Sequence, residues 1–379
     1  MSALVFDKTP ARVYWELTRA CDLACRHCRA EAMSRRAAYE LTTAECERVL
    51  GQLAAAPPPR SHVILTGGDP LKRPDLVGLV QRATDLGLDV AVAPSATMHL
   101  TAGVVQALKA AGVSAMSLSI DGPHAAWHDG LRGVFGCFGW TLAAAQRIVG
   151  AGIPLQINTL LSAETEPHLE DIARVVASLG ASRWSLFVLV HVGRGRALRA
   201  LTPDDCDRAF RWLIANSRRW PFTVTTTEAP HYRRVMIQGM RAAGRSAAEI
   251  HASPAARGFG IRDGNGVMFI SANGDVTPSG FLPLPCGNVR EDDPVEIYRE
   301  HALFRALRAP DLFRGRCGRC DFRRVCGGSR ARAWAASGDV LEADPLCSWE
   351  PDVAMPVRAM PATMTVDAIE ERCLEEASG

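Results

Sequence analysis

The feature that most constrains the fold is a regular alternation, over residues 1–222, of short apolar runs with longer helical patterns. Near-continuous apolar runs indicate strands that are buried on both faces of a parallel sheet. Six such units predict an open doubly wound sheet or a partial barrel, and either fold places its site at the C-terminal ends of the strands. The expected strands are Val13–Leu17, His62–Thr66, Leu88–Ala93, Ala115–Ile120, Pro154–Thr159 and Trp184–Val190, and the expected helices lie near Thr43–Ala55, Pro74–Leu86, Thr101–Ala111, Phe138–Ala151, Pro167–Leu179 and Pro203–Ser217.

The pattern changes after residue 222. Thr223–Thr227 reads as one more strand at the start of a bridging segment, residues 223–265, that is otherwise irregular and helical. Val267–Ile270, an Asn-Gly turn signal and Asp275–Thr277 predict a β-hairpin. The sequence is therefore divided into a barrel (1–222), the bridging segment (223–265), a Gly-, Arg- and Cys-rich domain (266–350) and a tail (351–379) whose composition suggests poor order.

Charge and hydropathy exclude several classes of partner. The chain has 379 residues and a net charge of only +2, which argues against a nucleic acid or another polyanion. No apolar run reaches the roughly 18–20 residues of a membrane span, and the N-terminus lacks a secretory pattern. We therefore expect a cytoplasmic protein, in which the twelve cysteines serve some purpose other than disulfides.

The cysteines separate into two clusters and five isolated positions. Scattered cysteines usually behave as small buried hydrophobic residues, and this is expected of the isolated ones. Thiolates that lie close together repel, so each tight cluster indicates a bound metal. The isolated cysteines are Cys46, Cys137, Cys206, Cys286 and Cys373.

The first cluster, Cys21, Cys25 and Cys28, follows directly after the first expected strand. Three thiolates can bind three irons of a [4Fe–4S] cluster and leave the fourth iron open, and an open position distinguishes a reactive site from a structural one. The alternative is a zinc site with His27 as the fourth ligand. Adjacent side chains such as His27 and Cys28 would be awkward partners on one metal, which favours iron.

The Cys-x3-Cys-x2-Cys spacing after the first strand resembles the radical S-adenosylmethionine (SAM) superfamily. The resemblance implies a partial (β/α)6 TIM-like barrel in which SAM chelates the open iron of a [4Fe–4S] cluster. An electron from the reduced cluster then splits SAM into methionine and a 5′-deoxyadenosyl radical, and the radical abstracts hydrogen from an unreactive carbon. A flavodoxin- or ferredoxin-type protein is the electron donor that the resemblance implies.

Three strand ends match the superfamily's SAM-binding elements. Each element alone could be an ordinary polar strand end, but together and in order they support the resemblance. The expected SAM-binding residues are Gly67, Gly68 and Asp69 after the second strand, Ser119 and Asp121 at the end of the fourth, and Asn158 at the end of the fifth.

The second cluster consists of Cys317, Cys320, Cys326 and Cys347, and four thiolates form a closed site for zinc or for an iron–sulfur cluster. The run resembles the SPASM/twitch domain of radical SAM enzymes, which implies an auxiliary [4Fe–4S] cluster. Full SPASM domains carry two. Here Ser279 stands where the Gly-x4-Cys element has its cysteine, so we expect one auxiliary cluster. Cys286 could be a spare ligand, a substrate-facing thiol or a buried residue, and we favour the last of these.

The C-terminal segments around residues 263–290 and 326–333 resemble the branch of these enzymes that modifies heme-type tetrapyrroles at propionate side chains, including by oxidative decarboxylation. Arg194 and Arg196, after the sixth strand, would suit a substrate with carboxylates, although they could equally hold loops. The alternatives are a maturase of a ribosomal peptide or a small-molecule precursor, and an iron–sulfur electron-transfer protein. Candidate catalytic residues by position alone are Tyr14, His124, His191, Arg194 and Glu228.

Overall fold

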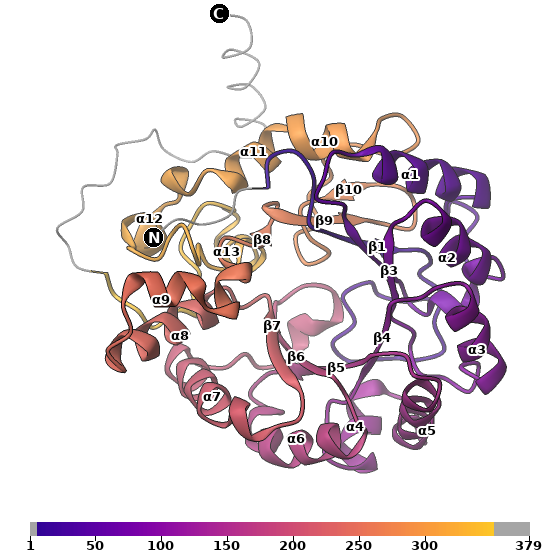
Figure 1. The fold of residues 1–379 in the computed structure, drawn as a ribbon, viewed down its shortest axis with the longest axis horizontal. Coiled ribbons are helices and arrows are strands. Elements are labelled where there is room, and N and C mark those ends of the chain that lie inside the picture. The colour runs from indigo at the N-terminus through magenta and orange to yellow at the C-terminus, as the bar shows by residue number, and fades with distance from the viewer. Residues whose placement is uncertain (1–5, 352–379) are drawn as a thin grey trace, which may run out of the picture.

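The computed structural model describes residues 6–351. Its first part is the expected partial barrel, in which parallel strands alternate with helices that cover the outside of a curved sheet (Figure 1). The strands are β1 (Arg12–Glu16), β2 (His62–Thr66), β3 (Asp89–Val92), β4 (Ala115–Ser119), β5 (Leu155–Leu161), β6 (Arg183–Val188) and β7 (Thr223–Thr227). The helices are α1 (Thr43–Ala55), α2 (Leu76–Asp85), α3 (Ala102–Ala110), α4 (Ala125–Arg132), α5 (Cys137–Gly150), α6 (Leu169–Ser178) and α7 (Pro203–Asn216).

Local signals explain why most of these elements begin where the sequence predicts. Helix α1 starts at a capping box, in which the Thr42 side chain accepts from the Glu45 amide and Glu45 accepts from the Thr42 amide. The Thr202 side chain caps α7 by accepting from the Asp205 amide, and Pro203 lies in the first turn. Strand β5 differs from the expectation: it continues to Leu161, so Asn158 lies within the strand and not at its end.

The strand order is β10-β9-β1-β2-β3-β4-β5-β6-β7, with every neighbouring pair from β9 to β7 parallel. Alternate residues of β1 divide between the two faces of the sheet. Val13 and Trp15 are buried against the helices, whereas Tyr14 and Glu16 point to the inner side of the curve. The predicted hairpin, β9 (Gly266–Ile270) and β10 (Val276–Thr277), forms, and β9 pairs with β1 and so extends the barrel sheet.

Most of the remaining elements lie at one side of the barrel (Figure 1), where α8 and α9 pack against the segment after α12 through Ile237, Ile250, Phe322 and Val325. They are mostly short, as expected from the Gly- and Arg-rich sequence. Besides β9 and β10, they are α8 (His231–Ala242), α9 (Ala247–Ala252), β8 (Arg262–Asp263), α10 (Pro294–Glu300), α11 (Ala302–Arg308), α12 (Gly315–Arg319) and α13 (Arg330–Ser337). The 3-10 turns are η1 (Pro70–Lys72), η2 (Glu166–His168), η3 (Gly193–Ala197), η4 (Ser217–Arg219), η5 (Pro254–Gly258) and η6 (Pro310–Leu312).

Four of the five isolated cysteines are buried, as predicted. Cys46, Cys137, Cys206 and Cys286 are buried, while Cys373 and the predicted tail from residue 352 onward lie outside the described residues. Within residues 6–351, the longest apolar helices are all too short or too polar to cross a bilayer.

Candidate functional site

The first cysteine cluster lies on the loop that leaves the C-terminal end of β1. Burial alternates strictly along this loop: Cys21, Leu23 and Cys25 are buried, whereas Asp22, Ala24 and Arg26 are exposed. The loop closes on itself because the Cys21 amide donates to the Met33 carbonyl at 2.7 Å and the Met33 amide donates to the Arg19 carbonyl at 2.9 Å. The loop therefore presents its sulfur atoms to the interior of the barrel end as one preformed group.

Two glycines hold this loop in place from the end of β2. The Gly68 amide donates to the Thr18 carbonyl at 2.7 Å, and the Asp69 amide donates to the Ala20 carbonyl at 2.7 Å. A Cβ at Gly67 would lie 2.4 Å from the Thr18 oxygen, and one at Gly68 would lie 2.4 Å from the Ala20 oxygen. Glycine is required here by the close approach of two backbones.

The Asp69 side chain is internal. It accepts from the amides of Leu71 and Ser95 and from the Thr97 hydroxyl, and it does not line the cavity beside the cysteines. Burial raises its pKa above the usual range. In this structure Asp69 ties the ends of β2 and β3 together.

Each sulfur of the first cluster has a polar neighbour. The Leu23 amide donates to Cys21 Sγ at 3.3 Å, the Ala32 amide donates to Cys28 Sγ at 3.5 Å, and an Arg132 guanidinium nitrogen lies 3.8 Å from Cys25 Sγ. Burial raises the pKa of the Cys21 and Cys25 thiols, so their thiolate forms need nearby positive charge, as bound iron would supply. These neighbours fit an iron–sulfur cluster.

Arg132 also forms a buried ion pair with Asp121. Burial alone would raise the pKa of Asp121, but Arg132 and the neighbouring histidines lower it to about 2. His27 Nε2 lies 3.9 Å from the Asp121 carboxylate, and burial, followed by Arg132, lowers the pKa of His27 to about 4. Asp121 is thus an anion, and His27 is neutral at pH 7.

A cavity of about 230 Å³ opens beside the first cluster. Five of the six predicted SAM-binding residues line it, and these are Gly67, Gly68, Ser119, Asp121 and Asn158. Apolar residues also line it, and they come from the end of β6 and the segment after it, together with Phe281 from the segment after β10. The cavity therefore combines polar strand ends beside the cysteines with apolar lining residues.

The five catalytic candidates do not line this cavity. Tyr14 lies on the inner face of β1, and His124 is exposed at the start of α4. His191 is exposed, and its Nε2 lies 3.1 Å from the Leu198 carbonyl oxygen. The Arg194 amide donates to the Cys28 carbonyl at 3.1 Å, and its Nε and one Nη are buried without a hydrogen-bond partner.

Glu228 follows β7 with a positive φ of 54°. Its carboxyl oxygens accept from the Ser279 hydroxyl at 3.1 Å and from the Ser329 hydroxyl at 2.6 Å. Burial and the adjacent Asp263 raise the pKa of Glu228 well above its ordinary value. Glu228 therefore joins the end of the barrel sheet to the C-terminal part through its two serine partners.

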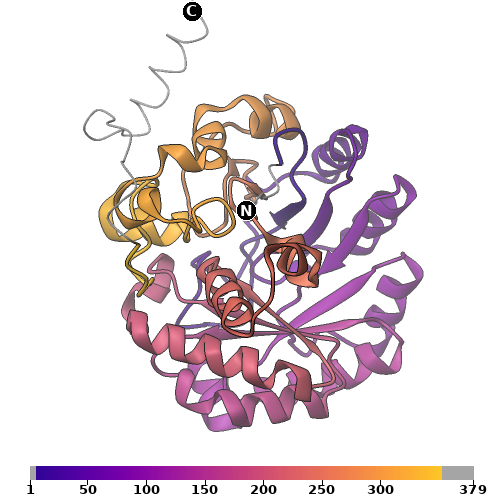
Figure 2. The ribbon, with the colours of Figure 1, turned by 60° about the vertical axis from the view of Figure 1, so that its left-hand side comes forward.

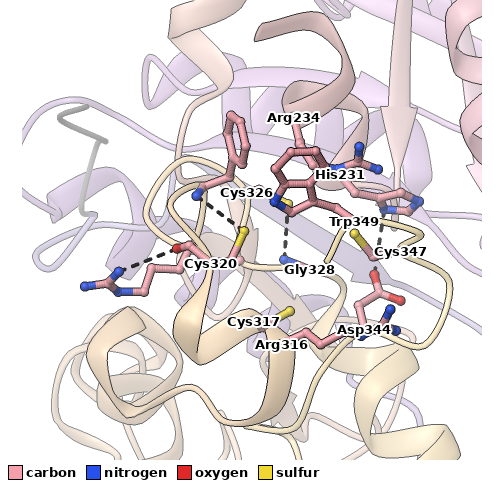
Figure 3. A pocket seen from close by; sticks show the side chains of 13 residues that line it. His231, Arg234, Arg316, Cys317, Cys320, Cys326, Gly328, Asp344, Cys347 and Trp349 are labelled. Atoms are coloured by element: carbon pink, nitrogen blue, oxygen red, sulfur yellow. Dashed lines mark hydrogen bonds and ion pairs between the residues drawn. The ribbon is translucent and has the colours of Figure 1, made fainter. Parts of the chain in front are cut away.

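The four cysteines of the second cluster lie together in the structure. Cys317, Cys320, Cys326 and Cys347 line one small pocket, together with His231, Arg234, Asp344 and Trp349 (Figure 3). Cys326 Sγ accepts from the Gly328 amide at 3.4 Å, Cys320 Sγ accepts from the Phe322 amide at 3.4 Å, and Cys317 Sγ accepts from Arg330 at 3.5 Å. Burial raises the pKa of Cys320 to about 11 and that of Cys326 further still.

Three residues of the first site were missed by the sequence reasoning. The Ser95 hydroxyl lies 3.4 Å from Cys21 Sγ and donates to the Gly68 carbonyl at 2.6 Å. Arg132 and Phe281 are the other two. A polar residue just after the third strand was a usable signal for Ser95, whereas helix α4, which carries Arg132, has no side-chain cap and ends in a Gly-rich stretch.

Comparisons with known proteins agree with this geometry. The model of the radical SAM superfamily matches residues 15–176. An AdoMet-dependent heme synthase of Oleidesulfovibrio alaskensis is 38% identical over 91% of this chain and 89% of its own length, and one of Methanosarcina barkeri is 38% identical over 92% and 99%. Curated relatives that are 28–30% identical include a pre-heme d1 synthase and PqqA peptide cyclases.

Among solved structures, Streptococcus suis SuiB bound to S-adenosylmethionine matches with a TM-score of 0.71 and 17% identity, covering 90% of this chain and 78% of SuiB. This likeness concerns the fold. The sequence relatives go further: the chain belongs to the radical SAM superfamily and is an enzyme that uses a [4Fe–4S] cluster and SAM.

Proposed function

We propose that this enzyme removes carboxyl groups oxidatively from the propionate side chains of a heme-type tetrapyrrole. The observation that carries the proposal is the 38% identity, over nine tenths of the chain, to proteins named AdoMet-dependent heme synthases. A pre-heme d1 synthase, also named for a tetrapyrrole, is among the more distant relatives. The apolar residues in the lining of the cavity are compatible with such a substrate.

The residues of the first site would divide the work as follows. Cys21, Cys25 and Cys28 would hold the cluster, while the backbone at Gly67 and Gly68 and the side chains of Ser119, Asp121 and Asn158 would contact SAM. Asp69 would act indirectly, by fixing the Gly68 backbone. When bound, the cluster and SAM supply a 5′-deoxyadenosyl radical that takes a hydrogen atom from the substrate.

The proposed reaction uses one electron to cleave SAM and releases one electron from the substrate, so it needs no net oxidant. Removal of one hydrogen atom from the propionate chain, followed by loss of carbon dioxide and one electron, leaves a vinyl group. Arg194 does not line the cavity, but two of its buried nitrogens have no hydrogen-bond partner, and the side chain would bind a substrate carboxylate if it turned toward the cavity. The electron released per side chain equals the electron used to cleave SAM.

The second site would hold one auxiliary [4Fe–4S] cluster that accepts this electron. Four cysteine sulfurs around one pocket, each in a buried or half-buried position, form a closed ligand set. The N–H donors to Cys317, Cys320 and Cys326 would stabilise the ligated thiolates. Ser279 stands at the position where a second auxiliary cluster would have a cysteine ligand, and its hydroxyl donates to Glu228 instead. This is consistent with a single auxiliary cluster.

The electron donor would be a flavodoxin- or ferredoxin-type protein, and the enzyme would work in the cytoplasm, where its cysteines stay reduced. A peptide substrate is the second candidate, favoured only by the 28–30% identical PqqA peptide cyclases. An electron-transfer protein without chemistry of its own is the third, and SAM cleavage would exclude it.

The test is an anaerobic assay of the reconstituted enzyme with SAM, a reductant and an iron porphyrin that carries propionates. The proposal predicts one 5′-deoxyadenosine and one carbon dioxide for each vinyl group formed. A parallel assay with a precursor peptide should give no peptide product. Deoxyadenosine without any change in the porphyrin would contradict the proposed substrate.

A further inference from the structure

The second cysteine site lies within a basic surface that the proposed reaction does not explain. We call it the arginine face and define it as residues 233–258 and 311–326. The two segments pack together through Ile237, Phe322 and Val325, and the Arg241 guanidinium lies 5.2 Å from the centre of the Phe322 ring. Figures 1 and 2 show α8, α9 and α12, which belong to these segments, on the same side of the barrel.

The charge of this face differs from that of the chain. Residues 233–258 contain five arginines and one glutamate, and residues 311–326 contain five arginines and two aspartates, which gives a net charge of +7 against +2 for the whole protein. Arg234 is buried, and Arg233 donates to backbone carbonyls. The other eight arginines still outnumber the three acids of the face and the two acids, Asp339 and Glu350, that pair with it.

The second site reaches the surface at this face. Cys317, Cys320 and Cys347 are half-buried, and the Trp349 ring at the pocket is 36% exposed. In the first site, by contrast, Cys21 and Cys25 are buried, and only Cys28 is half-buried. A redox centre held by the second site would therefore be the more accessible of the two to another protein.

We propose that the arginine face docks an acidic one-electron carrier protein, which exchanges an electron with the second site. This rests on the proposed function, because the carrier needs a redox-active cluster there. One electron enters the reaction when SAM is cleaved and one leaves when carbon dioxide is lost, so the same carrier can deliver and collect. Opposite charges on the two surfaces steer the encounter and raise the association rate at low salt.

The experiment uses the full chain with Cys21, Cys25 and Cys28 replaced by Ala, so that only the second site can hold a cluster. After iron analysis and circular dichroism confirm one cluster and a folded chain, the second-order rate of electron transfer from reduced, acidic flavodoxin is measured by stopped flow. Arg319→Glu/Arg324→Glu in this background should slow the transfer at least tenfold at low salt, and the difference should shrink at high salt. Neither arginine lines the cysteine pocket.

Arg174→Glu/Arg208→Glu is the matched control, because these exposed, ion-paired arginines lie on α6 and α7 of the barrel. It should leave the rate unchanged. Equal rates in both double variants and the parent would overturn the proposal and leave the face to another occupant, such as a second copy of the chain. A parent without iron would instead remove the auxiliary cluster, a failure that metal analysis detects before any transfer is measured.

Discussion

The two cysteine sites differ in what surrounds their sulfur atoms. The first has three cysteines on one loop and opens onto a cavity of about 230 Å³ lined by polar strand ends. The second has four cysteines from the C-terminal part around a small pocket that lies near the surface. An incomplete ligand set beside a cavity allows chemistry at the metal, whereas a complete set suits electron storage and transfer.

The largest difference should appear when one ligand is removed from each site. Cys21→Ala should abolish reductive cleavage of SAM, because the first cluster loses one of its three ligands. Cys320→Ala should spare SAM cleavage but lower turnover of the porphyrin substrate. Both are measured as deoxyadenosine and product under the same anaerobic conditions. Deoxyadenosine production by Cys21→Ala would refute the assignment of the first site.

A smaller change should affect the first site alone. In Gly68→Ala, the new Cβ would meet the Ala20 carbonyl oxygen at 2.4 Å, so the cysteine loop must shift. We expect the iron content to fall from about eight to about four per chain, since a misplaced loop cannot hold its cluster. Gly78→Ala, on α2 with no atom near the added Cβ, is the control and should keep its full iron content.

The buried ion pair of the first site should contribute more to stability than an ion pair on the surface. Arg132→Met should destabilise the protein by about 3–5 kcal/mol, because it leaves the buried Asp121 without its partner. SAM affinity should fall as well. Arg174→Met, which removes only exposed ion pairs on α6, should cost far less. Urea unfolding checks both values, and equal costs for the two variants would contradict the buried ion pair.

The smallest effect concerns pH. Burial, aided by nearby arginines, lowers the pKa of His128 beside the first site and of His231 beside the second to about 4. Because the unfolded chain binds more protons between pH 6.5 and 4, the free energy of unfolding should fall as the pH falls through this range. We expect on the order of 2 kcal/mol per histidine at pH 5, and His128→Gln should weaken the dependence measured by urea unfolding. An unchanged slope would contradict a neutral buried His128.

Sequence reasoning predicted the parts of the fold that have local signals. His62–Thr66, Thr223–Thr227 and Thr43–Ala55 have the expected bounds, because apolar runs and a capping box mark them directly. The parallel pairing of β9 with β1 was not predicted. It joins segments some 250 residues apart, and nothing in either segment specifies its partner.

The same distinction applies to the site. The cysteine motifs and the glycines after β2 are visible in the sequence because their spacing is unusual. Arg132 was not found, since it reaches the cavity from a helix with no motif of its own, and Phe281 was not found because the resemblance of residues 263–290 to other enzymes does not mark which side chain enters the cavity. The predicted role of Asp69 in binding SAM stays a proposal in a modified form, because its carboxylate is engaged by Leu71, Ser95 and Thr97.

The most direct test of the two-site account is the iron and sulfide content per chain after anaerobic reconstitution, in the wild type and in the Cys21/Cys25/Cys28→Ala variant. The account predicts about eight irons falling to about four, which corresponds to one open and one closed four-iron cluster. Four irons and one zinc in the wild type would make the second site structural. No stable iron in either protein would contradict the account as a whole.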